Sequence, residues 1–84
     1  MITHVAIRFK GKMYSLPRPN RHHHVIRLIA DEIPGAHITQ EWQGFLDDTG
    51  KFLGRQEAVK VARKCGQILV KTSPSYMLFS EDLW

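Results

Sequence analysis

This sequence has little or none of several features that mark specialised classes of protein. It holds one cysteine, Cys65, which has no second cysteine for an internal disulfide and suits a reducing compartment. It has no apolar run long enough to span a bilayer. Its first residues also lack the basic and then apolar pattern of a secretory signal. We therefore expect a protein that is neither secreted nor bound to a membrane.

Motifs that mark common chemistries are missing too. There is no glycine-rich phosphate loop, no zinc-finger spacing of Cys and His, and no nucleophile elbow. With 84 residues, the chain is long enough for one core but not for a second domain or a buried cofactor such as a flavin. Its 43% of hydrophobic and 24% of charged residues are typical of a folded domain. We therefore expect one domain over residues 1–84, with no metal and no cofactor.

Acidic residues are absent from the first part of the chain. No Asp or Glu precedes Asp31, whereas six Lys or Arg and four of the five histidines lie within residues 1–35. Residues 36–84 carry equal numbers of basic and acidic side chains, so the net charge of +4 comes from the first part. A one-sided positive field attracts phosphates, nucleic acid or acidic protein surfaces. The alternative is a solvated basic face that only aids solubility.

The beginning of the chain has the pattern of a β-hairpin. Residues 3–9 alternate apolar and other side chains, which is the period of a half-buried strand. Lys10-Gly11 is a two-residue turn signal, because glycine adopts a positive φ at little cost. Pairing across this turn places Ile7 opposite Tyr14, so the apolar face continues onto the second strand.

The rest of the chain alternates helical and extended patterns. Asn20 is a good N-cap for a helix in which the apolar residues between His22 and Ile33 share one broad face. The later segments are a strand at 38–46, a turn at 47–50, a short strand at 51–53, a helix at 55–65 between Gly54 and Gly66, and a short strand at 68–70. The order ββα-ββ-αβ predicts a small α+β two-layer sandwich, with two helices on one face of a mostly antiparallel sheet.

The densest polar cluster lies at the entry to the first predicted helix. Free backbone N–H groups and the positive end of the helix dipole favour an anion there. Arg21 can hold a phosphate through two hydrogen bonds, and His22 and His23 can donate hydrogen bonds or move protons near neutral pH. Lys12, on the neighbouring hairpin, can reach the same space. The cluster therefore indicates a phosphate site.

Three interpretations of the adjacent histidines compete. A metal site is poorly supported, because successive helical residues point about 100° apart and cannot share one ion. A structural role is the second interpretation, since His22 lies at the same helical angle as Ile26 and Ile29 and can cover the edge of the core. The third is a phosphate site in which His22 and His23 form the catalytic acid–base pair.

A second candidate site lies at the start of the second predicted helix. Arg55 could hold another phosphate there, although a structural role at the helix start is the alternative. A base could be held by hydrogen bonds from Gln43 and by stacking on aromatic rings, for which the candidates are Tyr14, Trp42 and Phe45. Aromatic side chains in so small a core are also typical packing residues.

A set of short motifs suggests a relationship to a known family. The motifs are Ser15-Leu16-Pro17-x-Pro19-x-Arg21-His22-His23-x-Val25-Ile26, Gln43-Gly44-Phe45, Gly50-x-Phe52, Arg55-x-Glu57-Ala58, Gly66-Gln67 and Ser80-Glu81-Asp82-Leu83-Trp84. The set spans nearly the whole chain and resembles a family of short accessory proteins encoded by tailed bacteriophages. Short phage accessory proteins often counter host immunity, some by sequestering or cleaving nucleotide signals. The resemblance therefore implies an anti-defence role in the cytoplasm of the host bacterium.

Together, the residues and the resemblance give a hypothesis for function. The protein would bind a small nucleotide immune signal, such as a cyclic dinucleotide, with its phosphates on Lys12, Arg21 and Arg55. Cleavage would need no metal: one of the two histidines would deprotonate a ribose 2′-hydroxyl, and the other would protonate the leaving oxygen. Because a small chain has little depth for a pocket, a homodimer with the ligand between its subunits is plausible.

Three alternatives remain open at this stage. The protein could be a non-catalytic sponge that uses the same groups. It could instead inhibit a host defence protein by surface contact through the basic face or the last residues. Binding to long nucleic acid is the third alternative, and it would weaken steeply with salt.

Overall fold

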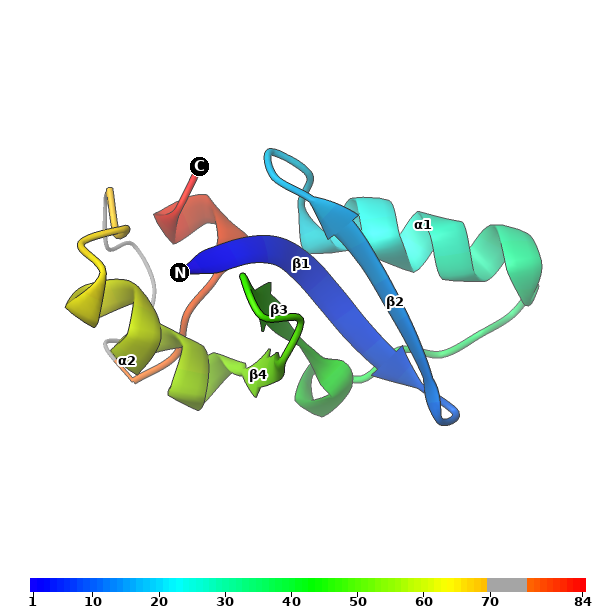
Figure 1. Ribbon diagram of the computed structural model, residues 1–84. Coiled ribbons are helices and arrows are strands. Elements are labelled where there is room, and N and C mark those ends of the chain that lie inside the picture. Colours follow the sequence, from blue (N-terminus) through cyan, green and yellow to red (C-terminus); the bar gives the residue numbers. More distant parts are fainter. Residues whose placement is uncertain (70–75) are drawn as a thin grey trace.

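The computed structural model describes residues 1–69 and 76–84 and contains one antiparallel sheet and two α-helices (Figure 1). The elements, in chain order, are β1 (Ile2–Phe9), β2 (Lys12–Pro17), α1 (His22–Glu32), the 3₁₀ turn η1 (Gln40–Trp42), β3 (Gln43–Asp47), β4 (Phe52–Gly54), α2 (Arg55–Lys64) and the 3₁₀ turn η2 (Ser80–Asp82). The strand order is β2-β1-β3-β4, and every neighbouring pair is antiparallel. The predicted α+β class is therefore confirmed.

The hairpin of β1 and β2 has the predicted turn and register. Lys10 and Gly11 both have positive φ, 50° and 76°, which is the requirement of a type I′ turn. Ile7 pairs with Tyr14, as the alternation of residues 3–9 predicts. Local sequence alone sets this register, because shifting it by one residue would turn the apolar side chains away from the core.

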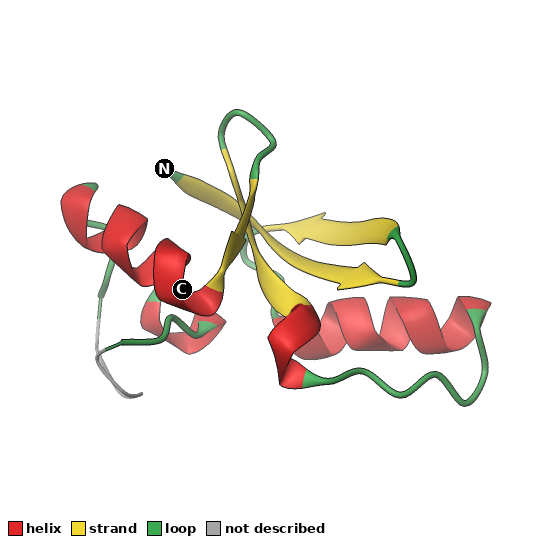
Figure 2. Ribbon diagram, turned by 90° about the horizontal axis from the view of Figure 1, so that it is seen from below, coloured by secondary structure: helices red, strands yellow, loops and turns green. Residues whose placement is uncertain are grey.

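Both helices cover the same face of the sheet (Figure 2). An apolar row crosses all four strands on this face, and its members are Leu16, Val5, Phe45 and Leu53. Buried residues of both helices join the same hydrophobic core, including Val25 and Ile29 of α1 and Ala58 and Ala62 of α2. In Figure 1, α1 lies along the hairpin and α2 lies at the other end of the sheet, next to β4.

On the opposite face of the sheet, the ring of Phe52 packs over Gly44. A Cβ added to Gly44 in β3 would lie 2.7 Å from the ring of Phe52 and 2.3 Å from the carbonyl oxygen of Leu53. The guanidinium of Arg8 lies 4.6 Å from the centre of the Phe52 ring, on the same outer face. Gly44 is therefore required by close packing, because any side chain there would collide with its neighbours.

The helix ends follow local chemistry, with one correction. Arg21, and not the predicted Asn20, is the N-cap of α1. The backbone N–H of Arg21 donates to Nδ1 of His24, over 2.9 Å, so a histidine caps this helix from inside its first turn. Asn20 instead uses its side chain to bond the carbonyl oxygen of Pro17. The prediction for Asn20 was wrong because its side-chain amide bonds Pro17 in the turn, two residues before the helix begins.

Both ends of the second helix, α2, lie where they were predicted. Gly54 is its N-cap, and Gly66, with φ of 67°, follows its last turn. The N–H of Gln67 bonds the carbonyl oxygen of Ala62, and the N–H of Gly66 bonds that of Arg63, which is the Schellman pattern. The amide side chain of Gln67 then makes two hydrogen bonds to the backbone of Ile2, so the end of α2 is joined to the start of β1.

Two predicted strands differ from the observed ones. The strand predicted at 38–46 is shorter, because residues 40–42 form η1 and pairing with β1 begins only at Gln43. Of the strand predicted at 68–70, Ile68 and Leu69 lie outside any strand, and Val70 lies outside the described residues. An apolar segment forms a strand only where the edge of another strand is free to pair with it. The sequence pattern does not show where that free edge lies.

The last residues pack against the rest of the protein. Leu78 and Leu83 are buried in the core. The indole N–H of Trp84 donates to the carbonyl oxygen of Asn20, over 2.8 Å, and Arg21 donates to the carbonyl oxygen of Trp84. The segment 76–84 is thus held at the entry to α1, and it also passes the start of α2, where Leu78 donates its N–H to the carbonyl oxygen of Arg55.

Candidate functional site

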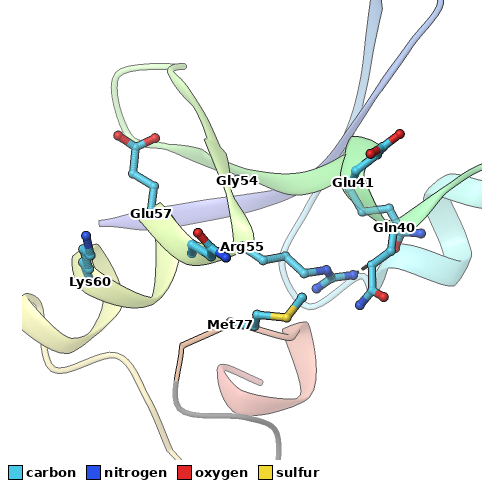
Figure 3. A pocket seen from close by; sticks show the side chains of 9 residues that line it. Gln40, Glu41, Gly54, Arg55, Glu57, Lys60 and Met77 are labelled. Atoms are coloured by element: carbon cyan, nitrogen blue, oxygen red, sulfur yellow. Dashed lines mark hydrogen bonds between the residues drawn. The ribbon is translucent and has the colours of Figure 1, made fainter.

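An open pocket of about 770 Å³ lies where η1, β4 and the first turns of α2 meet (Figure 3). Its lining side chains are mostly polar: Gln40, Glu41, Gln43, Gly54, Arg55, Gln56, Glu57, Lys60 and Met77. These residues come from three separate parts of the chain. The volume falls in the range of pockets that bind small molecules.

Arg55 is the central side chain of this pocket. In Figure 3 it extends from the start of α2 toward Gln40, with Met77 beside it. Its Nη1 donates to the carbonyl oxygen of Leu78 over 2.8 Å, and its Nη2 donates to Oε1 of Gln43 over 2.9 Å. The guanidinium also lies 4.4 Å from the centre of the Phe79 ring. These contacts hold the guanidinium in one place.

The charge of Arg55 is not fully compensated by the described residues. The side chain is only 7% exposed, its Nε has no hydrogen-bond partner, and it forms no ion pair within residues 1–69 and 76–84. Burial lowers the pKa of Arg55, while the more distant charges of Glu81 and Asp82 raise it. A buried cation without a direct partner is costly, and such positions are candidates for binding an anion.

The other lining groups offer hydrogen bonds and a second cation. The amides of Gln40, Gln43 and Gln56 can each donate and accept. Lys60 is exposed and lies one turn after Gln56. Glu57 lies 3.8 Å from Lys51, so its charge is partly balanced. An occupant with both an anionic group and a polar, planar edge would match this set of side chains.

Of the residues predicted to bind a ligand, Gln43 and Arg55 are brought together in this pocket. They are 12 residues apart in sequence, and the antiparallel pairing of β3 with β4 places them side by side. Both had a local signal, a helix start for Arg55 and a neighbouring glycine for Gln43. The other predicted residues lie elsewhere.

His22 is part of the core. Its Nε2 lies 2.6 Å from the carbonyl oxygen of Gly44, and its ring packs edge-on against Phe45, with ring centres 4.9 Å apart. Burial lowers the pKa of His22 to about 4, and the nearby positive charge of Arg55 adds to this effect. His22 is therefore neutral at pH 7, and the arrangement matches the structural interpretation of this residue.

His23 does not share the surroundings of His22. It is exposed, and its ring lies against that of His24, with centres 4.1 Å apart. Neither His22 nor His23 is among the residues that line the pocket. The rings of His22 and His23 therefore lie in different surroundings, as expected for neighbouring residues on a helix. The catalytic role of this pair stays a prediction.

Lys12 and Tyr14 are engaged with the end of α1. Nζ of Lys12 lies 2.9 Å from the carboxylate of Glu32 and 4.9 Å from the centre of the Tyr14 ring. Hydrogen bonds from Lys12 and Tyr14 lower the pKa of Glu32. These contacts join β2 to α1 and lie away from the pocket.

The remaining predicted residues also have partners inside the fold. Arg21 bonds the carbonyl oxygen of Trp84 and lies 3.6 Å from the carboxylate of Glu81. Trp42 packs edge-on against Phe9, with ring centres 5.6 Å apart, and Phe45 is fully buried. None of the three lines the pocket.

Several lining residues were missed by the sequence analysis. Lys60 had a usable signal, because it follows Gln56 at helical spacing and therefore shares its side of α2. Gln40 and Met77 had none, since they lie in irregular segments far apart in the chain. Only the packing of the last residues under the start of α2 brings Met77 to the site.

The fold and the pocket define a small α+β protein with an open, polar pocket beside the start of a helix. The chain belongs to the Phage T4 y16D protein family, whose family model matches residues 1–84. The resemblance to a phage protein family is thereby confirmed. A search of curated proteins and of solved structures found no match.

The described part of the chain also lacks a membrane-spanning helix and a cluster of metal-binding side chains. Neither α-helix within residues 1–69 and 76–84 has the length and hydrophobicity needed to cross a membrane. In the same part of the chain, no three His, Cys, Asp or Glu side chains are grouped as metal ligands would be.

Proposed function

We propose that this phage protein binds a small nucleotide signal of its host in the pocket beside α2 and withdraws it from host defence. The observation that carries the proposal is Arg55, a buried guanidinium with an unpartnered Nε at the pocket. An oxygen of a phosphate group would complete its hydrogen bonds and balance its charge. The Nε is covered in the free protein, so a ligand would have to displace the atoms that cover it.

The rest of the lining fits a nucleotide better than a simple anion. Lys60 supplies a second positive charge, and the start of α2 adds the favourable end of its dipole. The amides of Gln40, Gln43 and Gln56 can read the hydrogen-bonding edge of a base. A pocket of about 770 Å³ has room for a base together with its sugar and phosphate.

Sequestration fits this geometry better than cleavage. A metal-free attack by a ribose 2′-hydroxyl needs a base and an acid at the ligand. His22 is buried against Gly44, and His23 is exposed outside the pocket. Cleavage would therefore need His23 from a second copy of the chain, whereas binding needs only the residues already gathered around Arg55.

The family supports a setting for this activity. Nucleotide immune signals are made in the bacterial cytoplasm, so a protein that withdraws them would act in the cytoplasm of the infected bacterium. The ligand would be a cyclic dinucleotide or a related signal.

The experiment is to incubate the purified protein with a panel of cyclic dinucleotides, cyclic trinucleotides and NAD-derived signals, with and without EDTA. Free nucleotide is measured by chromatography before and after heat denaturation. We expect one compound to be depleted and then recovered intact on heating. Lys60→Ala should abolish most of this depletion. Lys64→Ala removes an exposed cation of the same helix outside the pocket, and it should not.

Two results would contradict the proposal. A cleaved product that persists in EDTA and disappears in His23→Ala would replace sequestration with catalysis. If every compound stays free and intact, the nucleotide function is wrong, and inhibition of a host defence protein by surface contact becomes the function to test.

A further inference from the structure

A second depression of about 470 Å³ adjoins the pocket along α2. It is lined by Gln56, Val59, Lys60, Arg63 and Tyr76, so it shares Gln56 and Lys60 with the first pocket. The two depressions therefore lie next to each other along α2. We define the α2 groove by the lining residues of both depressions.

The α2 groove follows one side of the helix. Gln56, Lys60 and Arg63 are spaced by four and three residues, which places them in one row. From Arg55 to Arg63 the helix rises by about 12 Å, at 1.5 Å per residue. Cations line this length at Arg55, Lys60 and Arg63, and the carboxylates of Glu41 and Glu57 also line its first part.

The far end of the groove offers an aromatic surface. Tyr76 is 61% exposed, so its ring is accessible to a ligand. It lines the second depression together with two cations and the side of Val59. An exposed ring beside cations is the arrangement that binds the flat face of a base while its phosphates contact the cations.

We infer that the ligand spans both depressions and is of dinucleotide size, with one nucleotide over Arg55 and the other against Tyr76. This inference rests on the proposed function, since it assumes that the first pocket holds a nucleotide. A mononucleotide would occupy the pocket at Arg55 and leave the second depression empty. Two phosphates, by contrast, would lie along the row of cations, with Lys60 between the two ends.

The test compares ligands of two lengths by isothermal titration calorimetry. The probes are AMP, GMP, CMP and UMP, and the linear and cyclic homodinucleotides of the same bases. For the preferred base, we expect a dinucleotide to bind at least about fivefold more tightly than the mononucleotide, the gain of one additional stacked base. Tyr76→Ala should remove this advantage without weakening the mononucleotide, and Tyr76→Phe should retain it.

The outcomes separate this inference from the proposed function. Lys60→Ala should weaken both ligand lengths, and Lys64→Ala neither. Equal affinities for the two lengths, or a dinucleotide advantage that survives Tyr76→Ala, would overturn the two-part ligand and leave nucleotide binding intact. If no nucleotide of either length binds, both the inference and the proposed function are wrong.

Discussion

At the scale of single residues, burial decides which titratable groups are free to act. His22, at the start of α1, was predicted to move protons, yet its Nε2 faces the carbonyl oxygen of Gly44 and its ring packs on Phe45. For Arg55 the sequence favoured a structural role at the helix start over the role of a phosphate ligand, and its contacts fit both. The two buried side chains differ in charge. The imidazole of His22 is neutral, whereas the guanidinium of Arg55 keeps its positive charge.

The buried state of His22 predicts how stability depends on pH. The pKa of His22 is about 4 in the folded protein, against 6.5 for an ordinary histidine. Between these values the unfolded chain takes up a proton that the folded protein does not, so stability falls as the pH drops from 6.5 to 4. The loss attributable to His22 is at most about 3 kcal/mol.

Urea unfolding at pH 7, 5.5 and 4.5 measures this effect. His22→Gln keeps a hydrogen-bond donor but does not titrate, so its stability should fall less over this range than that of the wild type. Asp47 and Glu32, whose pKa values are lowered by hydrogen bonds, contribute to both proteins and cancel in the comparison. Parallel curves for the two proteins would show that His22 is not buried in its neutral form.

At the scale of elements, the sheet depends on one close approach between strands. Phe52 of β4 lies over Gly44 of β3 and is itself covered by Arg8 of β1. This stack lies on the sheet face that has no helices on it. Its packing leaves no space for a side chain at position 44.

Gly44→Ala should therefore destabilise the protein by about 1–3 kcal/mol or more, because the new methyl group meets backbone as well as the Phe52 ring. Gly54→Ala is the matched control. It places a methyl group in open space at an ordinary φ of −66°, and its cost should stay within the roughly 1 kcal/mol of a poorer N-cap. Thermal and urea unfolding measure both. A cost for Gly44→Ala no greater than that for Gly54→Ala would contradict this packing.

Elements whose signals are local could be predicted from the sequence. The hairpin turn at Lys10-Gly11, the register of Ile7 with Tyr14, and the end of α2 at Gly66 each depend on a few adjacent residues. The start of β3 could not be predicted, because it depends on where β1 offers a free edge. The candidate site divides in the same way: Gln43 and Arg55 had local signals, whereas Met77 reaches the pocket only through the path of the last residues.

At the scale of the whole molecule, the charge excess of the first part of the chain does not mark the pocket. Lys12 is paired with Glu32, and Arg21 contacts Trp84 and Glu81, so two of the predicted phosphate ligands serve to join elements. The cations of the α2 groove come instead from the part of the chain with balanced charge. Counting charges along a sequence cannot show which of them will be paired once the chain has folded.

In the proposed function, Arg55 receives an anionic nucleotide from outside the protein. The decisive measurement is a set of proton–nitrogen correlation spectra of the arginine Nε–H groups, assigned with Arg55→Lys and titrated with the four ribonucleoside 5′-monophosphates and their cyclic dinucleotides. The Nε–H signal of Arg55 should shift and saturate with at least one of these compounds, because its unpartnered hydrogen gains an acceptor. The signal of Arg18, which lies outside the pocket, should not move. An Arg55 signal that stays unchanged with every compound at millimolar concentration would contradict the account.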